Sequence, residues 1–245
     1  MIRILSMLLF AAMLVGCEHR APMPRPVGAG PVSPEGSAKF EWVASYRKGD
    51  TNFEQVKNQI REGDVIAFWM TRKEARTGLF NVRMGALAYL TLDYGHSAIV
   101  VRLPGRKPPL RLFSCLPQIG SHFSAGLDEL KEKKFMVFRL DRWDEMDAER
   151  LREFARIARK KSDQGFAYDY LAACGIWNND LKPREQHEIQ GSYTCSTSVA
   201  AALHYAGFDM ANVKKRSMFQ LVSPKKVFTS KGRIMRSTRA SDAGK

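Results

Sequence analysis

Residues 193–207 have the sequence YTCSTSVAAALHYAG, and this stretch predicts one helix. Its centre is rich in alanine and leucine, which are strong helix formers. Gly207 is typical of the left-handed residue that follows a helix end. Helical spacing predicts one buried face made of Cys195, Val199, Ala202, Leu203 and Ala206. The pattern therefore predicts that Cys195 lies in the first turn and faces the core.

Cys195 has two interpretations at this point. A thiol in the first turn of a helix lies near unpaired backbone N–H groups and the positive end of the helix dipole, which favour the reactive thiolate. A lone cysteine is more often a small buried hydrophobic residue. The helix alone favours the second interpretation, so the rest of the chain has to distinguish them.

The N-terminal residues are typical of an export signal. Arg3 precedes an apolar run from Ile4 to Val15 that is too short for a stable membrane anchor. The run leads into Leu14-Val15-Gly16-Cys17, which resembles the lipobox of bacterial lipoproteins. The resemblance implies that residues 1–16 are a signal peptide and that Cys17 is lipidated. An ordinary cleaved signal with a chance cysteine is the alternative.

The sequence also predicts the location of the protein and the segments on either side of the folded domain. The residue after Cys17 is Glu18 rather than Asp, which by the lipoprotein sorting rule implies the periplasmic face of the bacterial outer membrane. Residues 17–38 are rich in Pro and Gly and predict an extended linker that holds the domain away from the membrane. One domain is expected at 39–236, in a chain of 245 residues, and a basic disordered tail at 237–245.

Positive charge is concentrated at the C-terminal end. The net charge is +14, and residues 211–245 hold ten Lys and Arg against one acidic residue, Asp242. Such a region is attracted to anionic lipid or lipopolysaccharide, and a solvated basic face without a ligand is the alternative. Nucleic acid is not an expected partner, because an exported lipoprotein does not meet it.

Three cysteines remain once Cys17 is assigned to lipidation: Cys115, Cys174 and Cys195. In an oxidising compartment an odd number leaves at least one thiol. Cys115 can pair with Cys174, or all three can be thiols, and the sequence leaves both possibilities open.

The hydrophobic pattern predicts an α+β domain. Apolar runs predict strands at 65–70, 93–103, 110–116 and 135–140, and periodic stretches predict helices at 51–61, 147–160 and 193–207. Strands joined by a short turn at 104–109, followed by helices, predict an antiparallel sheet with helices on its flank.

A thiol nucleophile needs a base within hydrogen-bond reach. His19 falls in the linker, and His122 and His187 fall in stretches that predict polar loops. His204 is nine residues after Cys195 on the same helix, too far along it to reach the thiol. His96 begins a predicted core strand, so placement and elimination both favour it as the base.

Five short motifs now occur in a characteristic order. They are Gly63-Asp64-Val65-Ile66, Gly95-His96-Ser97-Ala98-Ile99-Val100, Tyr168-Asp169, Tyr193-Thr194-Cys195-Ser196 and Ser223-Pro224-Lys225-Lys226-Val227-Phe228. This order resembles the circularly permuted NlpC-like cysteine hydrolases, the YiiX and lecithin–retinol-acyltransferase-like branch, in which the histidine strand precedes the cysteine helix. The resemblance implies a papain-like fold, Cys195 as nucleophile and His96 as base.

Two positions depart from that family. The family usually has a glutamate in its third strand as the third catalytic group, and the matching residue here is Ser114. A serine can hydrogen-bond an imidazole but cannot stabilise an imidazolium as a carboxylate does. Gln118 is a nearby substitute candidate. The family also tends to have Glu two residues after the cysteine, where this chain has Thr197.

The sequence thus predicts an envelope-anchored thiol hydrolase that cleaves an amide, peptide or acyl-ester bond through a Cys195–His96 dyad and an acyl-enzyme. The Cys195 backbone N–H, with support from Tyr193, is expected to stabilise the oxyanion. Peptide, peptidoglycan or acyl lipid is the expected substrate, and no cofactor or metal is expected. The alternatives are a catalytically weak lipoprotein that binds an envelope polymer or protein, and an acyltransferase.

Overall fold

The computed structural model describes residues 37–69, 94–165, 168–173, 176–178, 180–218 and 220–235. The predicted signal peptide, the predicted lipidation site Cys17, most of the predicted linker and the predicted tail lie outside these residues, as does Cys174. No helix within these ranges combines the length and the apolar character needed to cross a bilayer.

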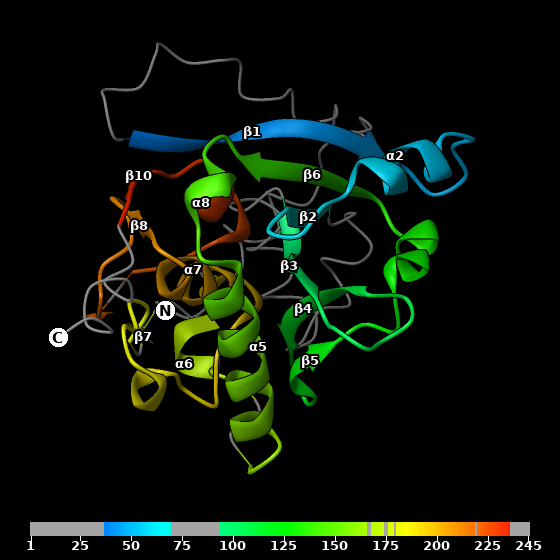
Figure 1. Ribbon diagram of the computed structural model, residues 1–245. Helices are drawn as coiled ribbons and strands as arrows, with labels where there is room; N and C mark the ends of the chain where they lie inside the picture. Colours follow the sequence, from blue (N-terminus) through cyan, green and yellow to red (C-terminus); the bar gives the residue numbers. More distant parts are fainter. Residues whose placement is uncertain are drawn as a thin grey trace, which may run out of the picture.

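An eight-stranded antiparallel sheet forms the centre of the fold, with strand order β5-β4-β3-β2-β6-β1-β10-β8 (Figure 1). Its strands are β1 (Ser37–Tyr46), β2 (Val65–Trp69), β3 (Tyr94–Arg102), β4 (Leu110–Leu116), β5 (Gly120–Phe123), β6 (Phe135–Leu140), β8 (Phe208–Met210) and β10 (Lys231–Ile234). A separate small sheet pairs β7 (Trp177–Asn178) with β9 (Ser217–Met218). The first and last strands in the chain, β1 and β10, are neighbours in the large sheet.

The described α-helices are α2 (Phe53–Gln59), α5 (Ala148–Ser162), α6 (Tyr170–Ala173), α7 (Cys195–Tyr205) and α8 (Pro224–Phe228). Short 3₁₀ helices occur at Leu127–Glu132, Trp143–Glu145 and Gln186–Glu188. The longest helix, α5, begins where Asp147 Oδ1 accepts a hydrogen bond from the Arg150 N–H at 3.0 Å. This cap satisfies one of the backbone donors that a helix start leaves unpaired.

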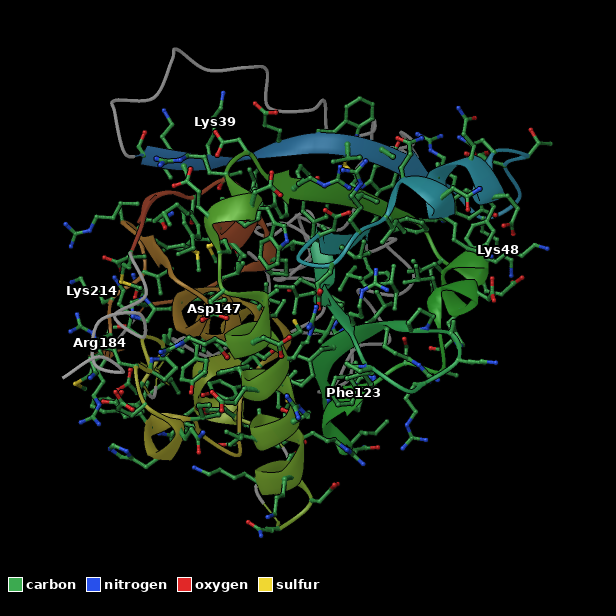
Figure 2. All side chains as sticks on the ribbon, in the orientation of Figure 1. Lys39, Lys48, Phe123, Asp147, Arg184 and Lys214 are labelled. Carbon is green, nitrogen blue, oxygen red and sulfur yellow. The ribbon has the colours of Figure 1, made fainter. Side chains whose placement is uncertain are left out.

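The two faces of the sheet bury two separate hydrophobic cores. Residues of α5, α7 and α8 pack on one face, which we call the α7 face. Residues of α2 and of the 3₁₀ helix Leu127–Glu132 pack on the other, which we call the α2 face. Figure 1 shows α5 and α7 side by side below the sheet and α2 at its far end, and Figure 2 shows side chains filling the space between these layers. The strands between the two cores are covered on both sides.

The α+β class, the antiparallel sheet and the flanking helices are as the sequence predicts. Predicted strands at 65–70, 93–103, 110–116 and 135–140 correspond to β2, β3, β4 and β6. The sequence did not predict β1, β5, β8 or β10. These four strands complete both edges of the sheet.

Candidate functional site

A capping box fixes the first turn of α7. Thr194 Oγ1 accepts a hydrogen bond from the Thr197 N–H at 3.1 Å, and Thr197 Oγ1 accepts one from the Thr194 N–H at 2.7 Å. The pair satisfies two backbone donors at the helix start. Cys195 is the first residue of the helix, as the sequence predicts. Thr197, which replaces the glutamate usual in the resembling family, is thus part of the cap.

The Cys195 thiol lies between the start of its own helix and strand β3. The backbone N–H groups of Ser97 and Ser196 interact with the sulfur. Burial raises the pKa of Cys195, and these N–H groups oppose the rise only in part. The hydroxyls of Ser97 and Ser196 lower the pKa of Cys195 as well, after the two backbone groups. Cys195 is therefore a neutral thiol at neutral pH.

Neighbouring residues of β3 face opposite sides of the sheet, because side chains alternate along a strand. Ser97 lies on the α7 face and His96 on the α2 face. The assignment follows from the next residues of the strand: Ile99 and Val101 pack in the α7-face core, and Ala98 and Val100 pack in the α2-face core.

The sequence predicts that His96 points toward Cys195. In the structure its side chain instead lies on the opposite face of the sheet from the thiol. The thiol meets the peptide group that follows His96, and no hydrogen bond joins thiol and imidazole in the part of the chain that the structure describes. The physical reason is the alternation of side chains along β3, which places His96 and Ser97 on opposite faces of the sheet. Regular pairing of β3 with β2 runs to His96 opposite Phe68, and a shift in register follows before Trp69.

The imidazole of His96 is largely enclosed on the α2 face. Its ring lies 5.3 Å from the ring of Phe68, measured between centroids. Burial, followed by the positive charges that His122 and Lys133 can carry, lowers the pKa of His96 to about 3. His96 is thus neutral at physiological pH.

Ser114 shares a face with His96. It is buried in β4, between Phe113 and Cys115 of the α7-face core, and so projects to the α2 face. Its partner across the β4–β5 pair is His122. The sequence predicted a loop for His122, but the structure places it in β5, and burial lowers its pKa. The structure thus brings His96, Ser114 and His122 to one face of the sheet.

Gln118 and Tyr193 occupy different settings. Gln118 is exposed in the turn between β4 and β5, with a left-handed φ of 67°, away from the buried part of the strand. Tyr193 is buried, and its hydroxyl accepts a hydrogen bond from the Gln190 N–H at 2.9 Å. Its carbonyl accepts one from the Asp169 N–H at 3.2 Å. Tyr193 therefore supports the chain before α7 and does not present its side chain to the thiol.

Cys115 is a second thiol close to the site. Its Sγ donates a hydrogen bond to the Tyr193 carbonyl at 2.9 Å, and burial raises its pKa to about 12. The charge that Cys195 can carry also raises the pKa of Cys115, so the two sulfurs lie in the same region. Cys174, the other cysteine with which Cys115 could pair, lies outside the described residues.

Tyr168 is a neighbour that sequence reasoning did not assign to the site. Burial raises its pKa well above the usual range, with a further contribution from the nearby Cys195. Asp169 follows it, and Asp169 Oδ1 accepts a hydrogen bond from the Ala172 N–H at 2.9 Å at the start of α6. The only sequence signal was the position of Tyr168-Asp169 in the ordered motifs.

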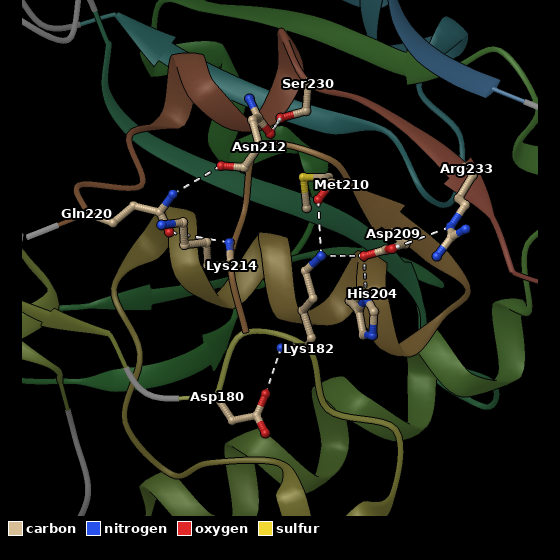
Figure 3. A network of polar contacts seen from close by, with 10 residues as sticks. All are labelled: Asp180, Lys182, His204, Asp209, Met210, Asn212, Lys214, Gln220, Ser230 and Arg233. Carbon is tan, nitrogen blue, oxygen red and sulfur yellow. Dashed lines mark hydrogen bonds and ion pairs between the residues drawn. The ribbon is translucent and has the colours of Figure 1, made fainter. Parts of the chain in front are cut away.

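The far end of α7 carries a polar network (Figure 3). Asp209 Oδ1 lies 2.5 Å from Lys182 Nζ and 3.5 Å from His204 Nδ1, and Asp209 Oδ2 lies 3.6 Å from the Arg233 guanidinium. His204 is buried, and burial lowers its pKa to about 4. This histidine belongs to the network and not to the Cys195 site.

No group of three or more His, Cys, Asp or Glu side chains suited to a metal ion occurs among the described residues. Comparisons with protein-family models, with curated proteins and with solved structures found no match for this chain.

Proposed function

We propose that the chain is a thiol hydrolase that forms an acyl-enzyme on Cys195, with His96 as the base and a papain-like fold of the permuted NlpC type. The observation that carries the proposal is the position of the thiol. Cys195 begins a capped helix, and its sulfur lies against the backbone of Ser97, the residue directly after His96. The thiol thus lies where the start of α7 meets the strand that carries His96.

The chemistry starts from two neutral groups. As Sγ bonds to the acyl carbon, its proton passes to the His96 imidazole, and the imidazolium then protonates the leaving group. Water attacks the resulting thioester, loses its proton to His96 and releases the acid and the thiol. In the structure the imidazole lies on the α2 face, so this chemistry requires the start of β3 around His96 to rearrange when substrate binds. Catalytic hydrogen bonds often form only in the substrate complex.

The start of α7 supplies the oxyanion donor. The Cys195 N–H belongs to the helix start, where backbone donors have no partner within the helix. Such a donor contributes about 3 kcal/mol to stabilising an oxyanion in comparable enzymes. Peptide, peptidoglycan and acyl lipid remain the proposed substrates, and an acceptor other than water would make the protein an acyltransferase. The proposed location is the periplasmic face of the outer membrane, with Cys17 as the lipid anchor.

Labelling with an electrophilic chloroacetamide at pH 7 tests the dyad. Mass spectrometry of the Cys195 and Cys115 peptides gives a separate rate for each thiol. We expect Cys195 to react faster than Cys115, and His96→Ala to slow Cys195 by about 10²-fold, a typical contribution of general base catalysis. His187→Ala is the matched control, because His187 is an exposed histidine in the 3₁₀ helix Gln186–Glu188. A wild-type rate in His96→Ala would refute His96 as the base.

A second candidate function is binding without efficient catalysis. It is favoured by the raised pKa of Cys195, by the pKa of about 3 for His96, which makes the imidazole a weak base, and by Ser114 in place of a carboxylate. In that case the fold holds an envelope polymer or protein, and slow labelling of both thiols is expected with or without His96.

A further inference from the structure

Exposed large hydrophobic side chains gather in two short segments of the chain. Outside these segments the exposed examples among the described residues are Trp42 and Ile119. The gathered residues are Tyr170, Leu171, Ile176, Trp177, Met218 and Leu221, and we call them the apolar patch. Single exposed apolar residues are normal, but a group of them marks an interaction surface.

The two segments are physically joined. β7 and β9 pair with each other, and Trp177 lies directly opposite Met218. Helix α6, which carries Tyr170 and Leu171, contacts β7. The patch is thus one surface built from residues far apart in the sequence.

The patch borders the Cys195 site at two points. The ring of Tyr170 lies 5.1 Å from that of Tyr168, measured between centroids, and Tyr168 is coupled electrostatically to Cys195. On the other side, the hydroxyl of Ser196 donates a hydrogen bond to the carbonyl of Val222, the neighbour of Leu221. A surface that receives the patch therefore lies next to the start of α7.

Charge identifies the partner. Residues 170–178 and 211–235 contain no Asp or Glu, whereas the second stretch contains seven Lys and Arg. Lys215 is paired with Asp180 and Glu188, and Arg233 lies near Asp209, so the cations that bear on the patch are Lys214 and Arg216. Lys214 and Arg216 are exposed beside β9, and Lys214 and Arg184 both project from the edge of the molecule that carries β7 and β8 (Figures 1 and 2). Trp and Tyr among protruding aliphatic side chains, with Lys and Arg around them, are characteristic of contact with a bilayer interface that carries anionic lipid.

We propose that the apolar patch docks on an anionic lipid bilayer and turns the start of α7 toward that bilayer. Trp177 and Met218 enter the headgroup region, and the neighbouring cations contact lipid phosphates. The docking does not depend on Cys195 being a nucleophile, so it can fail or succeed independently of the proposed hydrolase.

Tryptophan quenching by brominated lipid tests the docking in the chain from residue 17 to residue 245 with Cys17→Ser, so that no lipid anchor holds the protein on the vesicle. The chain has four Trp residues, and Trp177 is the one in the patch. With phosphatidylglycerol vesicles brominated in the acyl chains, we expect quenching of the emission. Trp177→Phe should remove at least half of the quenched signal, whereas Trp42→Phe, the control at a similar exposure outside the patch, should not. Equal loss in the two variants, or no quenching, would overturn the proposal.

A charge substitution gives a second, independent readout. Leu171 and Ile119 are both 55% exposed, but only Leu171 belongs to the patch. We expect Leu171→Glu to weaken binding to phosphatidylglycerol vesicles at least tenfold, and Ile119→Glu to leave it near wild type. A protein partner instead of a membrane would leave both variants and the wild type without vesicle binding. Chloroacetamide labelling of Cys195 in the same preparations reports separately on the proposed hydrolase.

Discussion

At the scale of single residues, both groups proposed to carry the chemistry are held in their neutral forms. Burial raises the pKa of the Cys195 thiol and lowers the pKa of the His96 imidazole to about 3. A thiolate–imidazolium pair would need the opposite shift at each group. The proton must therefore move during attack, because the resting site does not contain a thiolate.

This protonation state predicts the pH dependence of alkylation. The rate constant for Cys195 should rise continuously with pH through 9, since the pKa of the thiol is raised from an ordinary value of 9.0. An ion pair would instead produce a reactive plateau between about pH 5 and 8. Stopped-flow alkylation from pH 5 to 10, with a small thiol of pKa about 8.5 as reference, distinguishes the two. A plateau at low pH would contradict the neutral pair.

The sequence predicts the position of Cys195 but not the face of His96. The helix and its start are predicted correctly in the stretch 193–207, but the single buried face is wrong, because residues on all sides of α7 are buried. In β3 the residues after His96 are apolar on both sides of the strand, since both faces are buried. A continuous apolar run carries no alternation, so nothing in it indicates which face α7 covers.

At the scale of elements, the turn before β2 is anchored by the Gly63-Asp64 motif. Asp64 is fully buried, and its carboxylate accepts two hydrogen bonds at 2.8 Å from the Arg139 guanidinium on β6. Gly63 has a left-handed φ of 86° and packs under the ring of Trp143. The motif thus joins β2, β6 and the 3₁₀ helix Trp143–Glu145.

Substituting Gly63 tests this packing. A Cβ at Gly63 would lie 2.3 Å from the Trp143 ring, whereas a Cβ at Gly49, with a similar φ of 94°, would have no atom within 4 Å. Gly49→Ala should cost about 1–2 kcal/mol of unfolding free energy from backbone strain alone. Gly63→Ala should cost roughly 1–3 kcal/mol more from overpacking. Urea denaturation measures both, and equal losses would show that Trp143 moves aside without cost.

Elements with strong local patterns were predicted, and those defined by distant pairing were not. Helices α5 and α7 have apolar stripes and capping residues within their own sequences. Strand β1 depends on partners about 100 and 190 residues away in β6 and β10. Strands β8 and β10 are short and pair with each other, and neither has a local sequence pattern that predicts a strand.

At the scale of the whole molecule, buried histidines make stability depend on pH. The pKa is about 3 for His96 and about 4 for His204 in the folded chain, against an ordinary value of 6.5. Between about pH 6.5 and 4 the unfolded chain therefore binds protons that the folded chain does not. Stability is complete above this window and falls as pH decreases through it.

The contribution of His204 can be isolated. Asp180, Lys182, Arg184 and Asp209 are the charged groups that act on it, with burial as the larger effect. Going from pH 7.5 to 5.0 should cost the wild type on the order of 2 kcal/mol through His204. The His204→Asn variant should lose about 2 kcal/mol less unfolding free energy than the wild type between the two pH values. The His187→Asn variant should lose as much as the wild type. Urea denaturation at both pH values measures the unfolding free energy of each protein. Equal losses between pH 7.5 and 5.0 in all three proteins would exclude this role for His204.

The pairing of β1 with β10 has a consequence for the architecture as a whole. Ser37 lies opposite Arg233, so the two ends of the described chain leave the sheet side by side. A short connection across them, with a new opening in the exposed turn at 104–109, would leave the sheet and its neighbours unchanged. The order of the motifs along this chain is therefore one of several that the same arrangement in space allows.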